Sequence, residues 1–207
     1  NQWVPFSDEG RMDLLQNTDP KPDMIPTTVG IGELQGPGAS AQSGVFASTR
    51  DFLKKFIPAA IKRKIHLEFE IWDTSMLWNT LRLAEEGVFD KDMPFVFNYC
   101  SGDRNGVQAS TPRQMVHVWE EGQRLFPNAS WYATARASNY FQILVMAMVF
   151  GCTIVRIGAE DNTTLPDGTV AKDSVQLVET AVRIAKDLGR EVATVEEARE
   201  ILGIPKE

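Results

Sequence analysis

Apolar and polar positions alternate over short segments of the chain, and longer segments with helical spacing follow them. Residues 66–72 (HLEFEIW) alternate strictly, which is typical of a half-buried strand. Other short apolar segments also predict strands, the first of them weakly because Pro26 cannot donate to a ladder. These segments cover residues 24–31, 94–99, 130–135 and 153–157.

A helix is expected after each of these strands. Apolar residues recur there at intervals of three and four, and Thr111 and Thr194 begin capping patterns. The predicted helices cover residues 49–61, 76–86, 111–125, 139–150, 174–188 and 194–203, and a Gly/Pro/Ser-rich loop is expected over 32–44. Strands that alternate with helices imply parallel βα units, so the predicted fold class is α/β. Five units fit either part of a TIM barrel or a small doubly wound sheet, and both folds place chemistry at the carboxyl ends of the strands.

Composition and charge narrow the function class. The chain has 207 residues, enough for one sizeable core, and we expect a single α/β domain over residues 1–207. The net charge of −7 argues against nucleic acid or an anionic membrane as the main partner. Two cysteines do not make a disulfide framework, so a cytoplasmic location is expected. The longest apolar run, residues 141–150, is too short to span a bilayer.

Charged residues mark the strand over residues 66–72. Glu68 and Glu70 share one face of it, because side chains alternate along a strand, and the apolar residues between them share the other. A buried carboxylate is costly unless it is paired or performs chemistry. We interpret Glu68 as a buried ion-pair partner and Glu70, nearer the carboxyl end, as a functional residue.

A second charged cluster ends the last predicted strand. The segment VRIGAEDN places Arg156, Glu160 and Asp161 within six residues. Arginine stays protonated, an aspartate at a rim can abstract a proton next to a carbonyl, and a glutamate can ligate a cation. The same residues are equally consistent with a salt-bridge network that ties the last strand to its neighbours.

Other side chains carry weaker signals. His66 begins a strand, where it is expected to be solvated or to cap the chain end of the strand, and the two histidines do not form a ligand pair. Cys100 ends a strand, but the sequence shows no base that would activate its thiol.

The two charged segments resemble the β-keto acid cleavage enzymes, best known for 3-keto-5-aminohexanoate cleavage. VRIGAEDN and the tail LPDGTVAKDSVQLVETAVRIAKDLGREVATVEEAREILG carry most of the resemblance. HLEFEIWD, the later EEGVF and, more loosely, SWYATARA add to it, so the resemblance extends from about Asp23 onward. It implies a TIM barrel with a divalent metal, usually zinc. It also implies condensation of a β-keto acid with acetyl-CoA to give acetoacetate and a new CoA thioester.

The resemblance also implies roles for individual residues. Glu160 stands at the position of the carboxylate metal ligand, and Arg156 at that of the arginine that supports acid–base chemistry. Asp161 corresponds to the general base, and Glu70 to the glutamate beside the substrate. Thr28 takes the place of a substrate-binding residue that is asparagine in many relatives.

The sequence also departs from the family pattern. The family's His-x-His metal-binding strand and its Thr-Gly-Gly turn are not in this sequence, and residues 136–139 replace a glycine-rich turn. We therefore expect the chain to cover the last five βα units of an eight-unit barrel, without the first three strands, and to supply one metal ligand of three.

Three functional hypotheses follow. The first is a metal-dependent β-keto acid cleavage enzyme whose partners are a small β-keto acid and acetyl-CoA, with no nucleic acid or membrane partner and with homo-oligomeric assembly. The second is a non-catalytic α/β module in which the same residues form a structural ion network. The third is another metal-dependent barrel enzyme, such as an aldolase that acts on a keto acid.

Overall fold

Four strands form one parallel sheet, in the order in which they follow along the chain. The computed structural model describes residues 7–34, 44–102, 108–136 and 138–204. The sheet has the order β1-β4-β5-β6, made of β1 (Met24–Thr28), β4 (His66–Ile71), β5 (Val96–Gly102) and β6 (Ser130–Arg136). Each strand lies beside the strand that precedes it, without the reversal of order that defines a doubly wound sheet. This order is that of an arc of a barrel.

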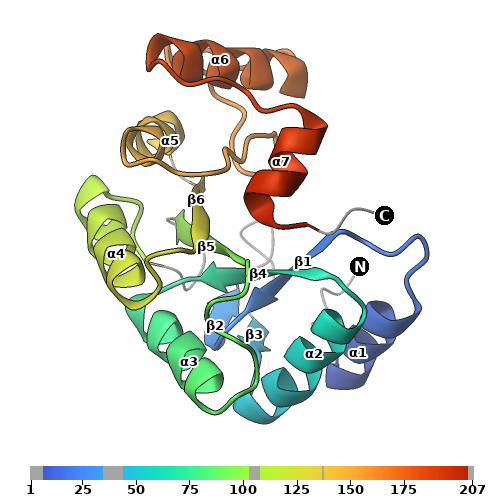
Figure 1. The fold of residues 1–207 in the computed structure, drawn as a ribbon. Helices are drawn as coiled ribbons and strands as arrows, with labels where there is room; N and C mark the ends of the chain where they lie inside the picture. Colours follow the sequence, from blue (N-terminus) through green and yellow to red (C-terminus); the bar gives the residue numbers. More distant parts are fainter. Residues whose placement is uncertain (1–6, 35–43, 103–107, 137, 205–207) are drawn as a thin grey trace.

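The helices lie around the outside of this arc (Figure 1). Helices α2 (Arg50–Lys62), α3 (Thr74–Glu85), α4 (Pro112–Leu125) and α5 (Tyr140–Val149) follow the four strands in turn. Helix α6 (Ser174–Asp187) and helix α7 (Val195–Leu202) complete the chain, and the predicted capping box of Thr194 and Glu197 is present. Helix α1 (Asp8–Asn17) was not predicted; it buries only Leu15 among its residues and has no clear apolar stripe. Among the described residues, no helix combines the length and apolar content needed to cross a bilayer.

The predicted first strand is shorter than expected. Strand β1 ends at Thr28, and the chain then forms an antiparallel pair of β2 (Ile31–Leu34) and β3 (Gly44–Ala47). The predicted loop over residues 32–44 is therefore wrong at both of its described ends, while residues 35–43 lie outside the described residues. Gly32 lies so close to the ring of Trp72 that a Cβ atom there would come within 2.1 Å of it. Gly32 therefore serves close packing against Trp72, where the sequence pattern predicted a loop.

The predicted strand over residues 153–157 is also wrong. The backbone N–H of Thr153 donates to the carbonyl of Trp131 at 2.8 Å, but no ladder continues from there along the described part of β6. The hydroxyl of Tyr140 donates to the carbonyl of Arg156 at 2.6 Å, so a side chain satisfies a group that a neighbouring strand would otherwise bind. Val155 and Ile157 still pack against the core, as the alternation predicted.

The two faces of the sheet differ in polarity. Leu67, Phe69 and Ile71 of β4 are fully buried on the face that the helices cover. An aromatic cluster extends this layer, with neighbouring ring centroids 5.1–6.2 Å apart. The opposite face carries the buried polar residues Glu68, Asn98 and Thr134. A polar interior of this kind is costly unless its groups are bonded to one another.

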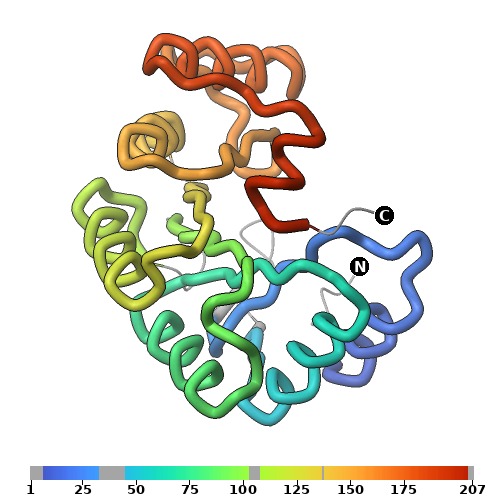
Figure 2. The backbone as a smooth tube through the Cα atoms, in the orientation of Figure 1, coloured from blue at the N-terminus to red at the C-terminus, as the bar shows by residue number. Residues whose placement is uncertain are grey.

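Helix α7 returns to the amino ends of the strands (Figures 1 and 2). Arg199 donates to both carboxylate oxygens of Asp23, just before β1, at 2.7 and 3.0 Å. Gly203, at φ 67°, lies against the side chain of Pro94, just before β5. The amino ends of the sheet are therefore covered by the tail of the chain, and the carboxyl ends carry the charged residues described next.

Candidate active site

Glu68 lies in the polar layer of the sheet and is only 7% exposed. Its Oε1 accepts a hydrogen bond from the hydroxyl of Tyr132 at 2.7 Å and a longer one from the amide of Asn98 at 3.5 Å. Thr134 donates to Asn98 in turn, at 2.8 Å. The expected ion pair is wrong: within the described part of the chain no cation lies within 4.0 Å of Glu68. Burial raises the pKa of Glu68, and the Tyr132 hydrogen bond opposes this only in part.

His66 begins the same strand and is buried, at 5% exposure, so the expectation of a solvated side chain is wrong. Burial lowers the pKa of its imidazole. The parallel register places His66 beside Met24 at the start of β1, and sequence alone does not show that pairing.

Glu70 and Thr28 meet across two neighbouring strands. They are partners in the register of β1 and β4, and the hydroxyl of Thr28 donates to Oε2 of Glu70 at 2.8 Å. Thr28 is 4% exposed, whereas Glu70 is half-buried toward the carboxyl end of its strand. The two residues assigned separately to catalysis and to substrate binding therefore form one unit.

Arg156 and Asp161 form a bidentate ion pair. Nε of Arg156 donates to Oδ2 of Asp161 at 2.6 Å, and Nη2 donates to Oδ1 at 3.1 Å. The side chain of Asp161 is 2% exposed. Burial alone would lower the pKa of Arg156, but the bonds to Asp161 and the charge of Glu160 outweigh it, so the pKa lies above its ordinary value. Arg156 therefore remains a cation, and it fixes the orientation of the aspartate.

Arg136 is a member of the cluster that sequence reasoning missed. It ends β6, and its Nε donates to Oδ1 of Asp161 at 2.9 Å while its Nη2 donates to Oε1 of Glu160 at 2.7 Å. Arg136 shares a strand face with Tyr132 and Thr134 by simple alternation, so this period was the signal that could have placed it in the interior. Asp161 thus accepts from two arginines on different segments.

Glu160 lies at the solvent side of the cluster, with 73% of its side chain exposed. Its Oε1 accepts from Nη2 of Arg136 at 2.7 Å, and its Oε2 lies 3.2 Å from Nη2 of Arg156. Residues 7–34, 44–102, 108–136 and 138–204 contain no group of three His, Cys, Asp or Glu side chains that could hold a metal ion. The described residues do not by themselves fit the ligand set of a divalent metal.

Glu70 and Arg156 act electrostatically on the same neighbouring side chains. The charges of Glu70 and Arg156 both act on Glu68, and both also act on the thiol of Cys100. Burial, reinforced by Glu70, raises the pKa of Cys100 well above its ordinary value. A thiol with a raised pKa is a poor nucleophile at neutral pH. The raised pKa therefore disfavours Cys100 as a nucleophile.

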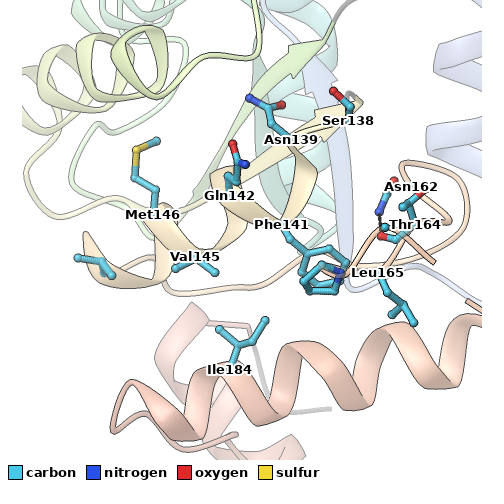
Figure 3. Close-up of a pocket in the computed structure, with 13 residues that line it drawn as sticks. Ser138, Asn139, Phe141, Gln142, Val145, Met146, Asn162, Thr164, Leu165 and Ile184 are labelled. Atoms are coloured by element: carbon cyan, nitrogen blue, oxygen red, sulfur yellow. Dashed lines mark hydrogen bonds between the residues drawn. The ribbon is translucent and has the colours of Figure 1, made fainter. Parts of the chain in front are cut away.

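A cavity of about 620 Å³ has Asn162, the residue that follows Asp161, among its lining residues. It lies between α5, α6 and the loop that follows Asp161, as Figure 3 shows. Its wall is mainly apolar, with Phe141, Val145 and Leu165 among its lining residues, and Asn162 lines it next to Asp161 in the chain. This volume falls in the range of small-molecule sites.

Comparison with known proteins adds the final observation. The model of the beta-keto acid cleavage enzyme family matches residues 2–204. The 3-keto-5-aminohexanoate cleavage enzyme of Acetoanaerobium sticklandii is 36% identical over 98% of this chain and 68% of its own length. The 3-oxoadipate:acetyl-CoA acetyltransferase of Cupriavidus necator is 28% identical over 67% of this chain and 47% of its own. The apo structure of ObcA superimposes with a TM-score of 0.68 and 15% identity over 89% of this chain, which spans 44% of that chain.

Proposed function

The chain belongs to the beta-keto acid cleavage enzyme family, and we propose on that basis that it cleaves a β-keto acid in a condensation with acetyl-CoA that gives acetoacetate and a new CoA thioester. The observation that carries the proposal is the Arg156–Asp161 pair beside the carboxyl ends of a parallel sheet whose interior also presents Glu70. Parallel barrels hold their reacting groups at these ends. The assignment of the chain to the last five of eight units remains a prediction.

Asp161 is the proposed general base. Deprotonation of the carbon next to a ketone needs a carboxylate held at hydrogen-bond distance from that carbon. Two arginines fix the side chain of Asp161, so its orientation costs nothing when the substrate binds. Arg156 is the proposed supporting cation, since it stabilises negative charge that develops beside Asp161.

Glu70 and Thr28 are the proposed substrate contacts on the neighbouring strands. The Thr28 hydroxyl donates its hydrogen to Glu70, which fixes the direction of the glutamate. The lone pairs of the hydroxyl oxygen can accept a hydrogen bond from a substrate. Glu70 then faces the substrate from β4.

Glu160 is the proposed metal ligand from this chain. The family resemblance implies a divalent metal, zinc in our expectation, and a bound metal would polarise the ketone oxygen. The described residues offer it no further His, Cys, Asp or Glu beside Glu160, so no step here is derived through it. A cytoplasmic location and homo-oligomeric assembly also remain predictions.

The cavity beside Asn162 is the proposed site for the apolar part of the thioester. Phe141, Val145 and Leu165 give it an apolar wall, and Asn162, which follows Asp161 in the chain, supplies a polar group to its lining.

A structural ion network is the second candidate function for the same residues. The contacts of Arg136 with Glu160 and Asp161 favour it, because they tie the end of β6 to the following segment. The proposed test measures product formation from acetyl-CoA and a panel of β-keto acids, with and without zinc. Asp161→Asn is expected to lower kcat by about 10²–10⁴-fold. Asp167→Asn, an exposed aspartate in a turn, is the control. Intact product formation in Asp161→Asn together with a lower melting temperature would favour the ion network.

A further inference from the structure

The segment that carries Arg156 and Asp161 is held by side chains at and just after the end of β6. Among the described residues, no strand ladder reaches Arg156 or Asp161. The hydroxyl of Tyr140 donates to the carbonyl of Arg156 at 2.6 Å, and Nε of Arg136 donates to Oδ1 of Asp161 at 2.9 Å. Nη2 of Arg136 also donates to Oε1 of Glu160 at 2.7 Å. The position of Asp161 therefore depends on contacts from the end of β6 and the start of α5.

Asn139, between Arg136 and Tyr140, ties this end of β6 to the loop before α4. Its Nδ2 donates to the carbonyl of Ser110 at 2.6 Å, and the hydroxyl of Ser110 donates to its Oδ1 at 2.9 Å. Ser110 and Tyr140 are buried, at 6% and 2% exposure. A glycine-rich turn has no side chains and could donate none of these bonds. The residues that replace such a turn in this sequence therefore add contacts to the site.

The two oxygens of Asp161 are not equivalent. Oδ1 accepts from Nε of Arg136 at 2.9 Å and from Nη2 of Arg156 at 3.1 Å, so both of its lone pairs are used. Within the described part of the chain, Oδ2 accepts only from Nε of Arg156, at 2.6 Å, and keeps one lone pair. The side chain of Asp161 is 2% exposed, and its two oxygens cannot exchange places by rotation unless these bonds break.

We propose that Arg136 is a positioning residue for proton abstraction: it occupies Oδ1 of Asp161 and so leaves Oδ2 as the oxygen that takes the proton. The proposal rests on the proposed function, in which Asp161 is the general base. The C–H bond next to the ketone breaks, its proton forms an O–H bond with Oδ2, and the electron pair remains on the substrate as an enolate. Arg136 acts through Asp161 in this role and needs no contact with the substrate. Its bond to Glu160 keeps the guanidinium from turning away from Asp161.

The test follows one partial reaction, the exchange for deuterium of the acetoacetate hydrogens between carboxylate and ketone. NMR in D₂O measures this exchange with acetyl-CoA absent, as the excess over the rate without protein. Arg136→Gln is expected to lower the exchange rate at saturation about 10- to 100-fold, because Asp161 loses its fixed orientation. The acetoacetate concentration at half-saturation should change less than about threefold.

Arg124→Gln is the matched control. Arg124 also donates to a carboxylate through Nε and Nη2, that of Glu121, and its side chain is 57% exposed, against 42% for Arg136. This variant should leave the exchange rate and the half-saturation unchanged. Rates refer to the folded fraction of each variant, which thermal unfolding measures.

Two further variants separate positioning from a merely structural role. In an Asp161→Asn background, Arg136→Gln should lower the residual exchange rate less than about twofold, because the carboxylate through which Arg136 acts is gone. Arg136→Lys keeps the charge without the fork and can bond only one of the two carboxylates well, so a loss of about threefold to tenfold is expected. This variant also covers the case in which Arg136→Gln does not fold.

The assignment is overturned by a wild-type exchange rate in Arg136→Gln or Arg136→Lys. It is also overturned by a loss that affects the half-saturation instead of the rate, or by the full loss in the Asp161→Asn background. Failure of the proposed function gives a different result. A wild-type protein whose exchange depends on Arg136 but that forms no CoA thioester would contradict the function and support the positioning role. An enzyme that forms the thioester and is unaffected by Arg136→Gln would do the reverse, and a wild-type protein without exchange would contradict both.

Discussion

The hydroxyl of Tyr132 lies 2.7 Å from Oε1 of Glu68, and this hydrogen bond joins β6 to β4 across the strand between them. Both side chains are in the polar interior, and both are nearly inaccessible to solvent. The bond therefore stabilises the arc of the sheet and also positions the layer on which Glu70 stands. The polar interior therefore stabilises the fold and also positions residues of the site.

Tyr132→Phe is expected to destabilise the chain by about 1–3 kcal/mol, because it leaves a buried carboxyl oxygen with only the long bond from Asn98. Urea unfolding followed by tryptophan fluorescence measures the change. The double variant with Glu68→Gln is the control, and the two changes should not add, since they share one bond. Full additivity would show that the pair does not interact.

The contribution of Glu68 to the stability of the chain should fall as pH rises above the ordinary pKa of its carboxyl group, 4.5. Burial raises the pKa of Glu68 in the folded state, so the folded protein holds this proton more tightly than the unfolded chain. The stabilisation is complete below the unfolded pKa and is lost as pH rises through the folded pKa. Glu68→Gln does not ionise and should lose this part of the pH dependence. Unfolding curves of the wild type and of Glu68→Gln at pH 4.5 and 7.5 test this expectation. An equal change in the free energy of unfolding between the two pH values in both proteins would contradict it.

Arg156→Lys should lower kcat about 10- to 100-fold while the protein remains folded, because lysine keeps the charge but cannot hold both oxygens of Asp161. The chain offers a matched control in Arg124. Its Nε and Nη2 donate to both oxygens of Glu121 at 2.9 and 2.7 Å on the exposed side of α4. Arg124→Lys should change the free energy of unfolding by less than about 1 kcal/mol and leave kcat unchanged. Equal effects of the two variants would show that the Arg156 pair has no special role in turnover.

Gly122→Ala should destabilise the chain by about 1–3 kcal/mol, although alanine favours a helix more than glycine does. A Cβ atom at Gly122, within α4, would lie 2.0 Å from the hydroxyl oxygen of Tyr99, whose ring is fully buried. Gly158→Ala is the control, because a Cβ atom there meets nothing within 4 Å. Thermal unfolding should separate the two variants, and equal melting temperatures would mean that the ring of Tyr99 has room to move.

Local patterns predicted the parts of this structure that depend on local geometry. The alternation of Glu68 and Glu70 placed both on the interior face, and Arg156 and Asp161 pair at a separation of five residues. Arg136 was missed because its partners lie 24 and 25 residues away, and the topology alone brings them together. The prediction of a strand over residues 153–157 is wrong for a related reason. Alternation shows which side chains face inward, but a hydrogen-bonded ladder also needs a neighbouring strand at the right distance. The ion pair expected for Glu68 failed because neutral partners, Tyr132 and Asn98, satisfy the carboxyl group instead.

Val145→Trp should raise the KM for acetyl-CoA about tenfold or more and leave kcat nearly unchanged. Val145 lines the cavity between α5 and α6 (Figure 3), so an indole side chain there would fill part of the space proposed for the apolar part of the thioester. Because Asp161 is held by its hydrogen bonds to Arg136 and Arg156, in which Val145 takes no part, the chemical step should be unaffected. Val178→Trp, at an exposed position of α6 that does not line this cavity, is the matched control and should leave both constants unchanged. A loss of kcat with an unchanged KM would place the thioester elsewhere and assign the cavity to the packing of α5 against α6.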